Sequence, residues 1–333
     1  MNAICAFSSD SRELYKADIY RVLAFPENHI VHFRYKTKYV DGKYIDKPNK
    51  LKKKTVAIFF THGNEIGSKK NQSQHISVRW AVVTNAEYSL DTDVFHVYMK
   101  LGKFCNLNIN IENSLSKLPP NKFFTNLSYS QLDKGNNWQS RILEIKNFFP
   151  KLTFFHLKDI MSGCRSVPVR YSNSGKSCFY NLKHGNRYLI KLAVSNPDDS
   201  DTKIEISDSS NEITINCINP FESSIQFDDH DIPISVKTLQ VSKQASLIEF
   251  KPTKKNMCSG AYEAMGEYST NIELDLTLGF KRPFYFGLFS TIAFWALILV
   301  RPEGNWPSCI ISIVATIMFF FSSGLLFYWF NKK

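Results

Sequence analysis

Three short stretches of this chain carry residue types that could do chemistry, and each lacks part of the required pattern. SNSGKSC (172–178) resembles the end of a phosphate-binding loop, which needs a glycine five residues before Gly175, where Arg170 stands. The residues that follow, CFYNLKHGNRYLI, predict strand and turn instead of the helix whose N-terminus would hold the phosphates. We therefore do not expect a nucleotide-binding loop here.

The acidic and histidine-containing stretches are also incomplete as metal sites. DDHD (228–231) holds three carboxylates and a histidine, but neighbouring residues of an extended chain face opposite sides, and a polar turn before Pro233 explains the stretch as well. PDDSD (197–201) could bind calcium, yet it lacks the spaced ligands and glycine of an EF-hand loop. His29 and His32 lie three apart on an expected strand and do not face together, and the chain has no C-x-x-C. The sequence predicts no catalytic residue, no metal site and no cofactor, and it favours a protein that is not an enzyme.

The elements around these stretches are mostly strands, because apolar and polar residues alternate along the first 280 residues. One helix is expected over 136–149, where Trp138, Ile142, Ile145 and Phe149 share a face and Pro150 ends it. In the first part the expected strands are 19–25, 29–35, 55–62, 75–84, 93–101 and 104–112. In the second part they are 187–195, 202–208, 211–218, 223–229, 234–241, 245–251 and 271–278.

This pattern predicts a mainly β cytoplasmic region of antiparallel sheets with one or two short helices. We expect a β-rich N-terminal domain over 1–160, a loop-like boundary over 158–177 and a β-sandwich over 178–279. Seven scattered cysteines are expected to be free thiols in a reducing compartment.

The C-terminal residues predict a transmembrane hairpin. The runs 283–300 and 309–330 contain no charged residue or histidine and have 18 and 22 residues, close to the length that crosses a bilayer. Between them, RPEGNWPS (301–308) predicts a tight turn. The expected membrane-interface residues are Lys281, Arg282, Arg301, Trp306, Trp329, Lys332 and Lys333. Their basic flanks predict a multi-pass protein of the inner (plasma) membrane with both termini in the cytoplasm.

Small residues recur every four positions on the two expected helices. They are Gly287, Thr291, Ser308, Ser312 and Thr316. This spacing lets helices approach closely, either within one hairpin or between several hairpins around a pore. A homo-oligomer is therefore one of the expected partners, beside the lipid bilayer itself.

Basic residues concentrate in KPNKLKKKT (47–55), within a chain of formal net charge +11. The expected basic patch consists of Lys50, Lys52, Lys53 and Lys54. Three interpretations stay open: a solvated loop, adsorption to an anionic lipid surface, and contact with nucleic-acid phosphates. Tyr35, Tyr39 and Tyr44 are interleaved with the lysines, as in single-strand binders and equally as in a β-hairpin.

A β-rich body followed by PFYFGLFSTIAFWALILV–RPEGNWPS–CIISIVATIMFFF, without a catalytic motif, resembles the two-transmembrane effectors of bacterial antiphage defence. By layout the chain is similar to the effectors encoded beside retron reverse transcriptases, and CBASS effectors share the principle. The resemblance is one of architecture over the whole chain. It implies a toxin that perturbs the inner membrane when triggered and is restrained by a regulatory protein or ribonucleoprotein from the same operon.

Two other functions stay open. One is a tail-anchored scaffold or adaptor whose cytoplasmic β-domain binds protein or nucleic acid. The other is a membrane-tethered enzyme that depends on a polar cluster such as Asp228 to Asp231.

Overall fold

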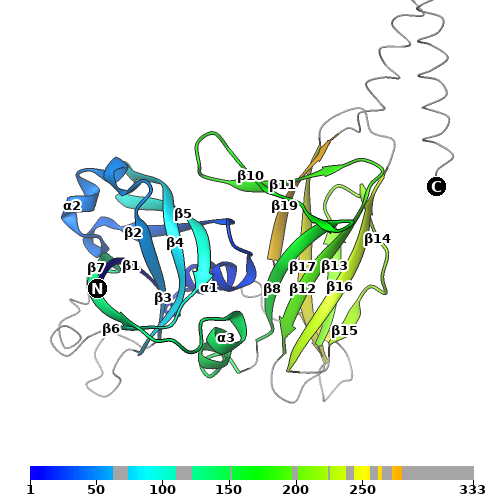
Figure 1. Ribbon diagram of the computed structural model, residues 1–333, viewed down its shortest axis with the longest axis horizontal. Coiled ribbons are helices and arrows are strands. Elements are labelled where there is room, and N and C mark those ends of the chain that lie inside the picture. The colour runs from blue at the N-terminus through cyan, green and yellow to red at the C-terminus, as the bar shows by residue number, and fades with distance from the viewer. Residues whose placement is uncertain are drawn as a thin grey trace, which may run out of the picture.

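The computed structural model describes residues 1–62, 74–109, 122–150, 152–196, 202–223, 226–237, 244–255, 262–264 and 272–279. Over these residues the protein is mainly β sheet with few helices. Figure 1 shows a curved N-terminal sheet with its helices beside a unit of two stacked sheets.

The N-terminal unit is built on one seven-stranded sheet in the order β2-β5-β4-β3-β1-β7-β6. Its strands are β1 (Asn2–Ser9), β2 (Ile30–Lys36), β3 (Thr55–His62), β4 (Gln74–Ser89), β5 (Val94–Phe104), β6 (Leu107–Ile109) and β7 (Phe124–Gln131). Strands β1 and β3 are parallel, with Ile4 opposite Val56, whereas the other neighbours in this sheet are antiparallel.

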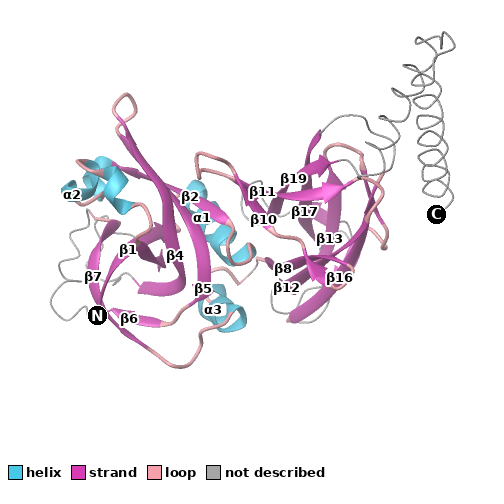
Figure 2. Ribbon diagram, turned by 45° about the horizontal axis from the view of Figure 1, so that its top comes forward, coloured by secondary structure: helices cyan, strands magenta, loops and turns pink. Residues whose placement is uncertain are grey.

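Two helices of the N-terminal unit lie on the side that faces the second unit. Helix α1 (Glu13–Ala24) buries Ile19, Val22 and Leu23, and its Tyr20 ring packs edge-on against Phe154 of β8 (Phe154–Ser162) at 5.5 Å between centroids. Helix α3 (Trp138–Lys146) begins at Asn137, whose side chain accepts a hydrogen bond from the Ser140 amide. Figure 2 shows both helices on the side of the N-terminal sheet that is nearer to the sandwich.

The second unit is a sandwich of two sheets. One has the order β14-β16-β12-β8-β9, and the other has the order β10-β11-β19-β17-β13-β15 with β18 paired to β17. The remaining strands are β9 (Arg165–Ser166), β10 (Val169–Tyr171), β11 (Cys178–Lys183), β12 (Arg187–Ser195), β13 (Thr202–Asp208), β14 (Ile213–Ile215), β15 (Phe221–Ser223), β16 (Phe227–Val236), β17 (Gln244–Lys255), β18 (Tyr262–Ala264) and β19 (Ile272–Gly279). Its core includes alternate side chains that are almost fully buried: Ile190, Leu192, Ile204, Ile206, Ile248 and Phe250.

Several predicted elements are corrected by the structure. Residues 19–24 of the expected strand are the end of helix α1, because ELYKAD, which begins at Glu13, forms one helix with them, and its buried face includes Ile19, Val22 and Leu23. Residues 158–177, expected to be a loop-like boundary, lie within the second unit, since they hold the end of β8, strands β9 and β10, and a turn. The predicted polar turn at DDHD is part of strand β16, in which Asp229 lies opposite Ala193 of β12.

The predicted ending of the fold and the predicted location are also corrected. In the part of the chain that the structure describes, no helix is long and apolar enough to cross a membrane. The longest of those helices, α1, has 12 residues, whereas a bilayer needs about 20. A mainly β fold that ends in a two-helix transmembrane hairpin, and a multi-pass protein of the inner membrane, are therefore not supported. The predicted spans, their interface residues and the small residues at four-residue spacing all lie outside the described residues.

Candidate functional site

The basic segment between β2 and β3 folds into three short helical turns on the edge of the N-terminal unit. They are η1 (Thr37–Tyr39), α2 (Gly42–Ile45) and η2 (Pro48–Leu51). Leu51 is 1% exposed, and Tyr44 and Ile45 pack against the same core. These apolar anchors hold the turns on the sheet, so that the lysines between them face solvent.

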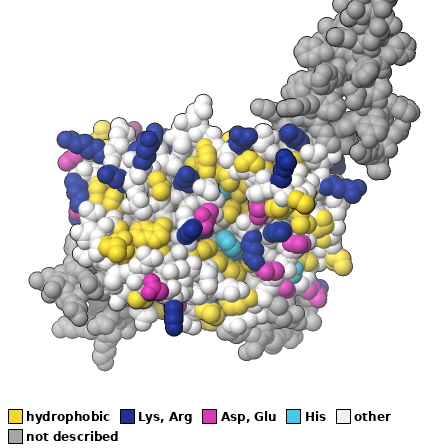
Figure 3. All heavy atoms as spheres, viewed as in Figure 1, with side chains coloured by type: hydrophobic (Ala, Val, Ile, Leu, Met, Phe, Trp, Pro, Cys, Tyr) yellow, Lys and Arg dark blue, Asp and Glu magenta, His cyan; other side chains and the backbone are white. Residues whose placement is uncertain are grey.

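Residues 36–54 carry eight lysines and two aspartates, which is more than half of the chain's net charge of +11. Figure 3 shows lysine and arginine side chains gathered over the region of α2. So much positive charge on one edge attracts anions and raises the local concentration of a negatively charged partner.

Four of these lysines line a pocket of about 650 Å³, which we call the lysine pocket: Lys43, Lys47, Lys50 and Lys54. Lys43 forms an ion pair of 3.3 Å with Asp41. Lys47, Lys50 and Lys54 form no ion pair with an acidic residue among those the structure describes. The pocket therefore holds several positive charges that the described protein does not neutralise.

Neutral polar side chains also line the lysine pocket. Tyr44 donates a hydrogen bond of 2.8 Å to Asn126 Oδ1 of β7, and Asn2 of β1 lies beside them. Burial, with Asp41 nearby, raises the pKa of Tyr44 to about 12, so its hydroxyl keeps its proton at neutral pH. The N–H groups of the two side-chain amides, beside ammonium groups, are donors that suit phosphate oxygens.

The predicted basic patch is only partly this site. Lys50 and Lys54 line the pocket, whereas Lys52 and Lys53 do not. Lys53 has a positive φ of 69° in the turn before β3, and its amide donates to the carbonyl of Val83. Asn2 and Asn126 were missed because they come from strands far away in sequence, and no signal in the spacing links them to the lysines.

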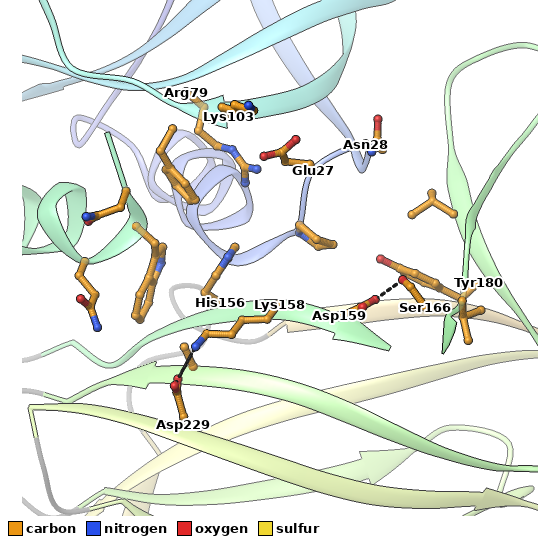
Figure 4. A pocket seen from close by; sticks show the side chains of 18 of the residues that line it. Glu27, Asn28, Arg79, Lys103, His156, Lys158, Asp159, Ser166, Tyr180 and Asp229 are labelled. Atoms are coloured by element: carbon orange, nitrogen blue, oxygen red, sulfur yellow. Dashed lines mark hydrogen bonds and ion pairs between the residues drawn. The ribbon is translucent and has the colours of Figure 1, made fainter. Parts of the chain in front are cut away.

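A second and larger hollow lies between the N-terminal unit and the sandwich, and we call it the interunit cleft. It has a volume of about 1190 Å³. One wall comes from the turn after α1, the end of β5 and the start of α3, and the other from β8, β9, β10, β11, β12 and β16. Figure 4 shows Glu27, Arg79 and Lys103 on the first wall and Lys158, Asp159 and Asp229 on the second.

The cleft is held between two sets of contacts. At one side the β10–β11 hairpin reaches the N-terminal sheet: Tyr171 donates to the Asn28 carbonyl at 2.9 Å, and Lys176 pairs with Glu87 at 2.6 Å. At the other side, His156 donates from Nδ1 to the Leu23 carbonyl at 3.1 Å and stacks on Trp138. Burial, with Arg79 nearby, lowers the pKa of His156 to about 3, so the ring is neutral at pH 7.

Arg79 is fully buried and supports the first wall. Its guanidinium donates to the carbonyl oxygens of Gly102, Val22 and Phe25, which ties β4 to the C-terminal end of α1. Its carbon lies 4.2 Å from the centroid of the Phe104 ring. Through Nε and Nη1, which donate to these backbone oxygens, Arg79 positions the wall.

The stretches that suggested chemistry are placed differently from one another. Lys176 of SNSGKSC lies at the tip of the β10–β11 hairpin, where Gly175 accepts a hydrogen bond of 2.7 Å from Thr84. Asp228 and Asp229 of DDHD line the interunit cleft, and Asp229 pairs with Lys158 at 2.7 Å. Residues 197–201 lie outside the described residues.

The side chains of His29, in the turn before β2, and His32, on β2, do not contact each other. His29 is buried and stacks on Phe25, whereas His32 is 3.0 Å from His96 between ring nitrogens. Within the described ranges, the structure contains no group of three or more histidine, cysteine or acidic side chains able to hold a metal ion.

Comparison with known proteins gives no relative from which a function can be transferred. The sequence matches no protein-family model and no curated protein. Among solved structures, a native alpha-2-macroglobulin from Escherichia coli, spanning domain MG7 to the C-terminus, matches 37% of this chain at 11% identity and a TM-score of 0.21. The match covers 16% of that protein's chain. A chimeric titin Z1Z2 tandem matches 84% of this chain and 96% of its own, at 8% identity and a TM-score of 0.17. These low scores carry no argument about function.

Proposed function

We propose that the protein binds nucleic acid through the lysine pocket, by contacts to phosphate groups and without strong sequence preference. The observation that carries the proposal is the set of three lysines, Lys47, Lys50 and Lys54, that surround a concave pocket without an acidic partner among the described residues. Lysines on a nucleic-acid surface replace condensed counterions, and the release of those ions drives binding.

The shape of the pocket favours a single strand over a duplex. A hollow of about 650 Å³ admits a phosphate and its sugar, whereas the phosphates of a duplex lie on a stiff convex surface. The Tyr44 ring packs against Phe124 on one side and under the Lys43 ammonium, so it offers little free face for base stacking. The expected specificity therefore comes from charge and strand flexibility, with little discrimination between bases.

An adaptor that binds nucleic acid by its β-rich region agrees with one of the functions that the sequence left open. The expected role in antiphage defence stays a prediction, because nothing in the geometry of the two sites bears on it.

The test is a binding measurement with fluorescein-labelled oligothymidylate at low salt. The triple variant Lys47→Glu, Lys50→Glu, Lys54→Glu is compared with wild type and with Lys134→Glu, Lys183→Glu, Arg187→Glu, which makes the same change in net charge at exposed sites outside the pocket. We expect the pocket variant to weaken binding by more than tenfold and the control by less than threefold. Equal weakening by both variants, or no binding by the wild type, would contradict the proposal.

A competitor separates nucleic acid from an acidic protein partner. Polyglutamate is densely charged, like the acidic tail of a partner protein, but it has no phosphate. If it displaces the oligonucleotide as well as unlabelled oligothymidylate of equal charge does, the pocket is a general site for acidic chains and the nucleic-acid proposal is wrong.

A further inference from the structure

The interunit cleft differs from the lysine pocket in its charge. Its lining contains three basic and four acidic side chains, so it is nearly neutral and does not favour a polyphosphate. Its volume of about 1190 Å³ is somewhat above that of ordinary ligand pockets, which hold about 300–1,000 Å³. A ligand for this cleft is therefore larger than a single amino acid and carries little net charge.

Most charged groups of the cleft are already paired within the protein. Lys158 of β8 pairs with Asp229 of β16 across the intervening strand β12, and Asp159 accepts hydrogen bonds from the Ser166 hydroxyl and the Ile160 amide. Arg79 donates from Nε and Nη1 to backbone carbonyls. These groups form the walls of the cleft, and their main partners are within the protein.

Glu27 and Lys103 are the exceptions. Both are exposed, both line the cleft from the N-terminal unit, and neither forms a hydrogen bond or an ion pair with another described residue. Figure 4 shows them on the same wall. Glu27 has the Arg79 guanidinium nearby, but its carboxylate forms no ion pair within the described residues. This carboxylate and the Lys103 ammonium, on a single wall, complement a ligand that carries one ammonium and one carboxylate of its own.

The remaining lining offers contacts that a peptide uses. Asn28 and Gln139 are exposed amides on the same wall, and a side-chain amide presents one donor face and one acceptor face to a peptide group. Phe104, Pro168 and Phe227 add apolar surface on both walls. Two exposed amides in a lining that also holds apolar side chains favour a short chain of peptide units over a compact metabolite.

We propose that the interunit cleft is a binding site for a short peptide segment of mixed charge. In this arrangement Glu27 receives an amino group of the peptide and Lys103 receives a carboxylate. Asn28 and Gln139 pair with its backbone, and an aromatic or aliphatic side chain lies against Phe104 and Phe227. Because the contacts beside Tyr171 and His156 already join the two units, the site is formed before the peptide arrives, which limits the entropy lost on binding.

The experiment selects peptides from a randomised pentapeptide library on the immobilised full chain and measures their affinity in solution by fluorescence anisotropy. We expect the selected peptides to carry one basic and one acidic group and at least one large apolar residue. Glu27→Gln and Lys103→Met should each weaken binding at least fivefold. The exposed control Glu222→Gln, on strand β15 outside the cleft, should leave the affinity unchanged.

A charge exchange distinguishes recognition from a merely structural effect. The double variant Glu27→Lys, Lys103→Glu keeps the net charge and should lose affinity for the selected peptide. It should regain affinity for a peptide in which the basic and acidic positions are interchanged. A structural role for the two residues would not produce this reversal.

Three results would overturn the proposal. They are no enrichment over the bare support, binding that neither Glu27→Gln nor Lys103→Met weakens, and selected peptides that are purely acidic and displaced by oligothymidylate. The last result would place the peptide in the lysine pocket. Failure of the nucleic-acid test leaves this experiment intact, because the two sites share no lining residue.

Discussion

The hydroxyl of Tyr171 donates a hydrogen bond of 2.9 Å to the carbonyl oxygen of Asn28, and these two residues are 143 positions apart in the chain. The bond joins strand β10 of the sandwich unit to the turn between α1 and β2, where Asn28 has a positive φ of 72°. It closes one side of the interunit cleft, and it shows that the β10–β11 hairpin serves as a contact between the units.

Tyr171→Phe removes this hydrogen bond while keeping the ring. We expect it to lower the free energy of unfolding by about 1 kcal/mol, the usual net value of one such bond, and no more because the Tyr171 side chain is 42% exposed. Urea unfolding followed by circular dichroism measures the change. Tyr129→Phe is the matched control, since the Tyr129 hydroxyl forms no hydrogen bond among the described residues. Equal midpoints for Tyr171→Phe and wild type would show that the contact contributes nothing.

Asp18 on α1 is a buried carboxyl whose contribution to stability depends on pH. Burial raises its pKa to about 6, although Arg34 and Arg21 nearby favour the charged form. Because folding raises the pKa of Asp18 from 3.8 to about 6, the folded state binds this proton more tightly than the unfolded chain does. The stability that comes from this proton is complete below pH 3.8 and is lost as the pH rises through 6. The free energy of unfolding of Asp18→Asn, taken relative to wild type, should therefore be about 1 kcal/mol higher at pH 8 than at pH 5. The exposed Asp91→Asn should show no such pH dependence in the same unfolding series, and a constant Asp18→Asn difference would contradict the account.

The effect of His29 on stability has the opposite pH dependence from that of Asp18, because it lowers stability at acid pH. Burial, with Arg79 nearby, lowers its pKa from 6.5 to about 3, so folding holds the ring neutral where the unfolded chain would protonate it. The stability that depends on this ring is present above pH 6.5 and is lost as the pH falls towards 3. His29→Phe keeps the stacking on Phe25, and it should reduce the loss of stability between pH 6.5 and pH 4.5 by about 2 kcal/mol. If the free energy of unfolding of His29→Phe fell between pH 6.5 and pH 4.5 as much as that of wild type does, His29 would not be the cause of the acid sensitivity.

The sequence predicts elements whose signal is local. Helix α3 follows from Trp138, Ile142 and Ile145 on one face and from Pro150 after it, and all three of those side chains are buried in the structure. The run 19–25 is too short for such a signal, because an apolar stretch of seven residues fits both a strand and the last two turns of a helix. Only the residues before it, from Glu13, decide in favour of the helix.

The two candidate sites divide in the same way. Lys50 and Lys54 could be found because the lysines of one site are neighbours in sequence. The interunit cleft could not be found, since it joins Glu27 and Lys103 to residues such as Asp159 and Asp229 from other strands. Sequence periodicity predicts single strands and helices. It does not predict which residues of two units meet, because this depends on how the sandwich packs against the N-terminal unit.

The most direct measurement of the central claim is the salt dependence of oligothymidylate binding. Each phosphate contact to a single strand contributes about 0.7 to the slope of log K against log salt concentration. The variant Lys47→Gln, Lys50→Gln, Lys54→Gln should therefore bind with a slope that is shallower than wild type by about 2. A slope unchanged from wild type would show that these three lysines do not contact phosphate, and the proposed function would be wrong.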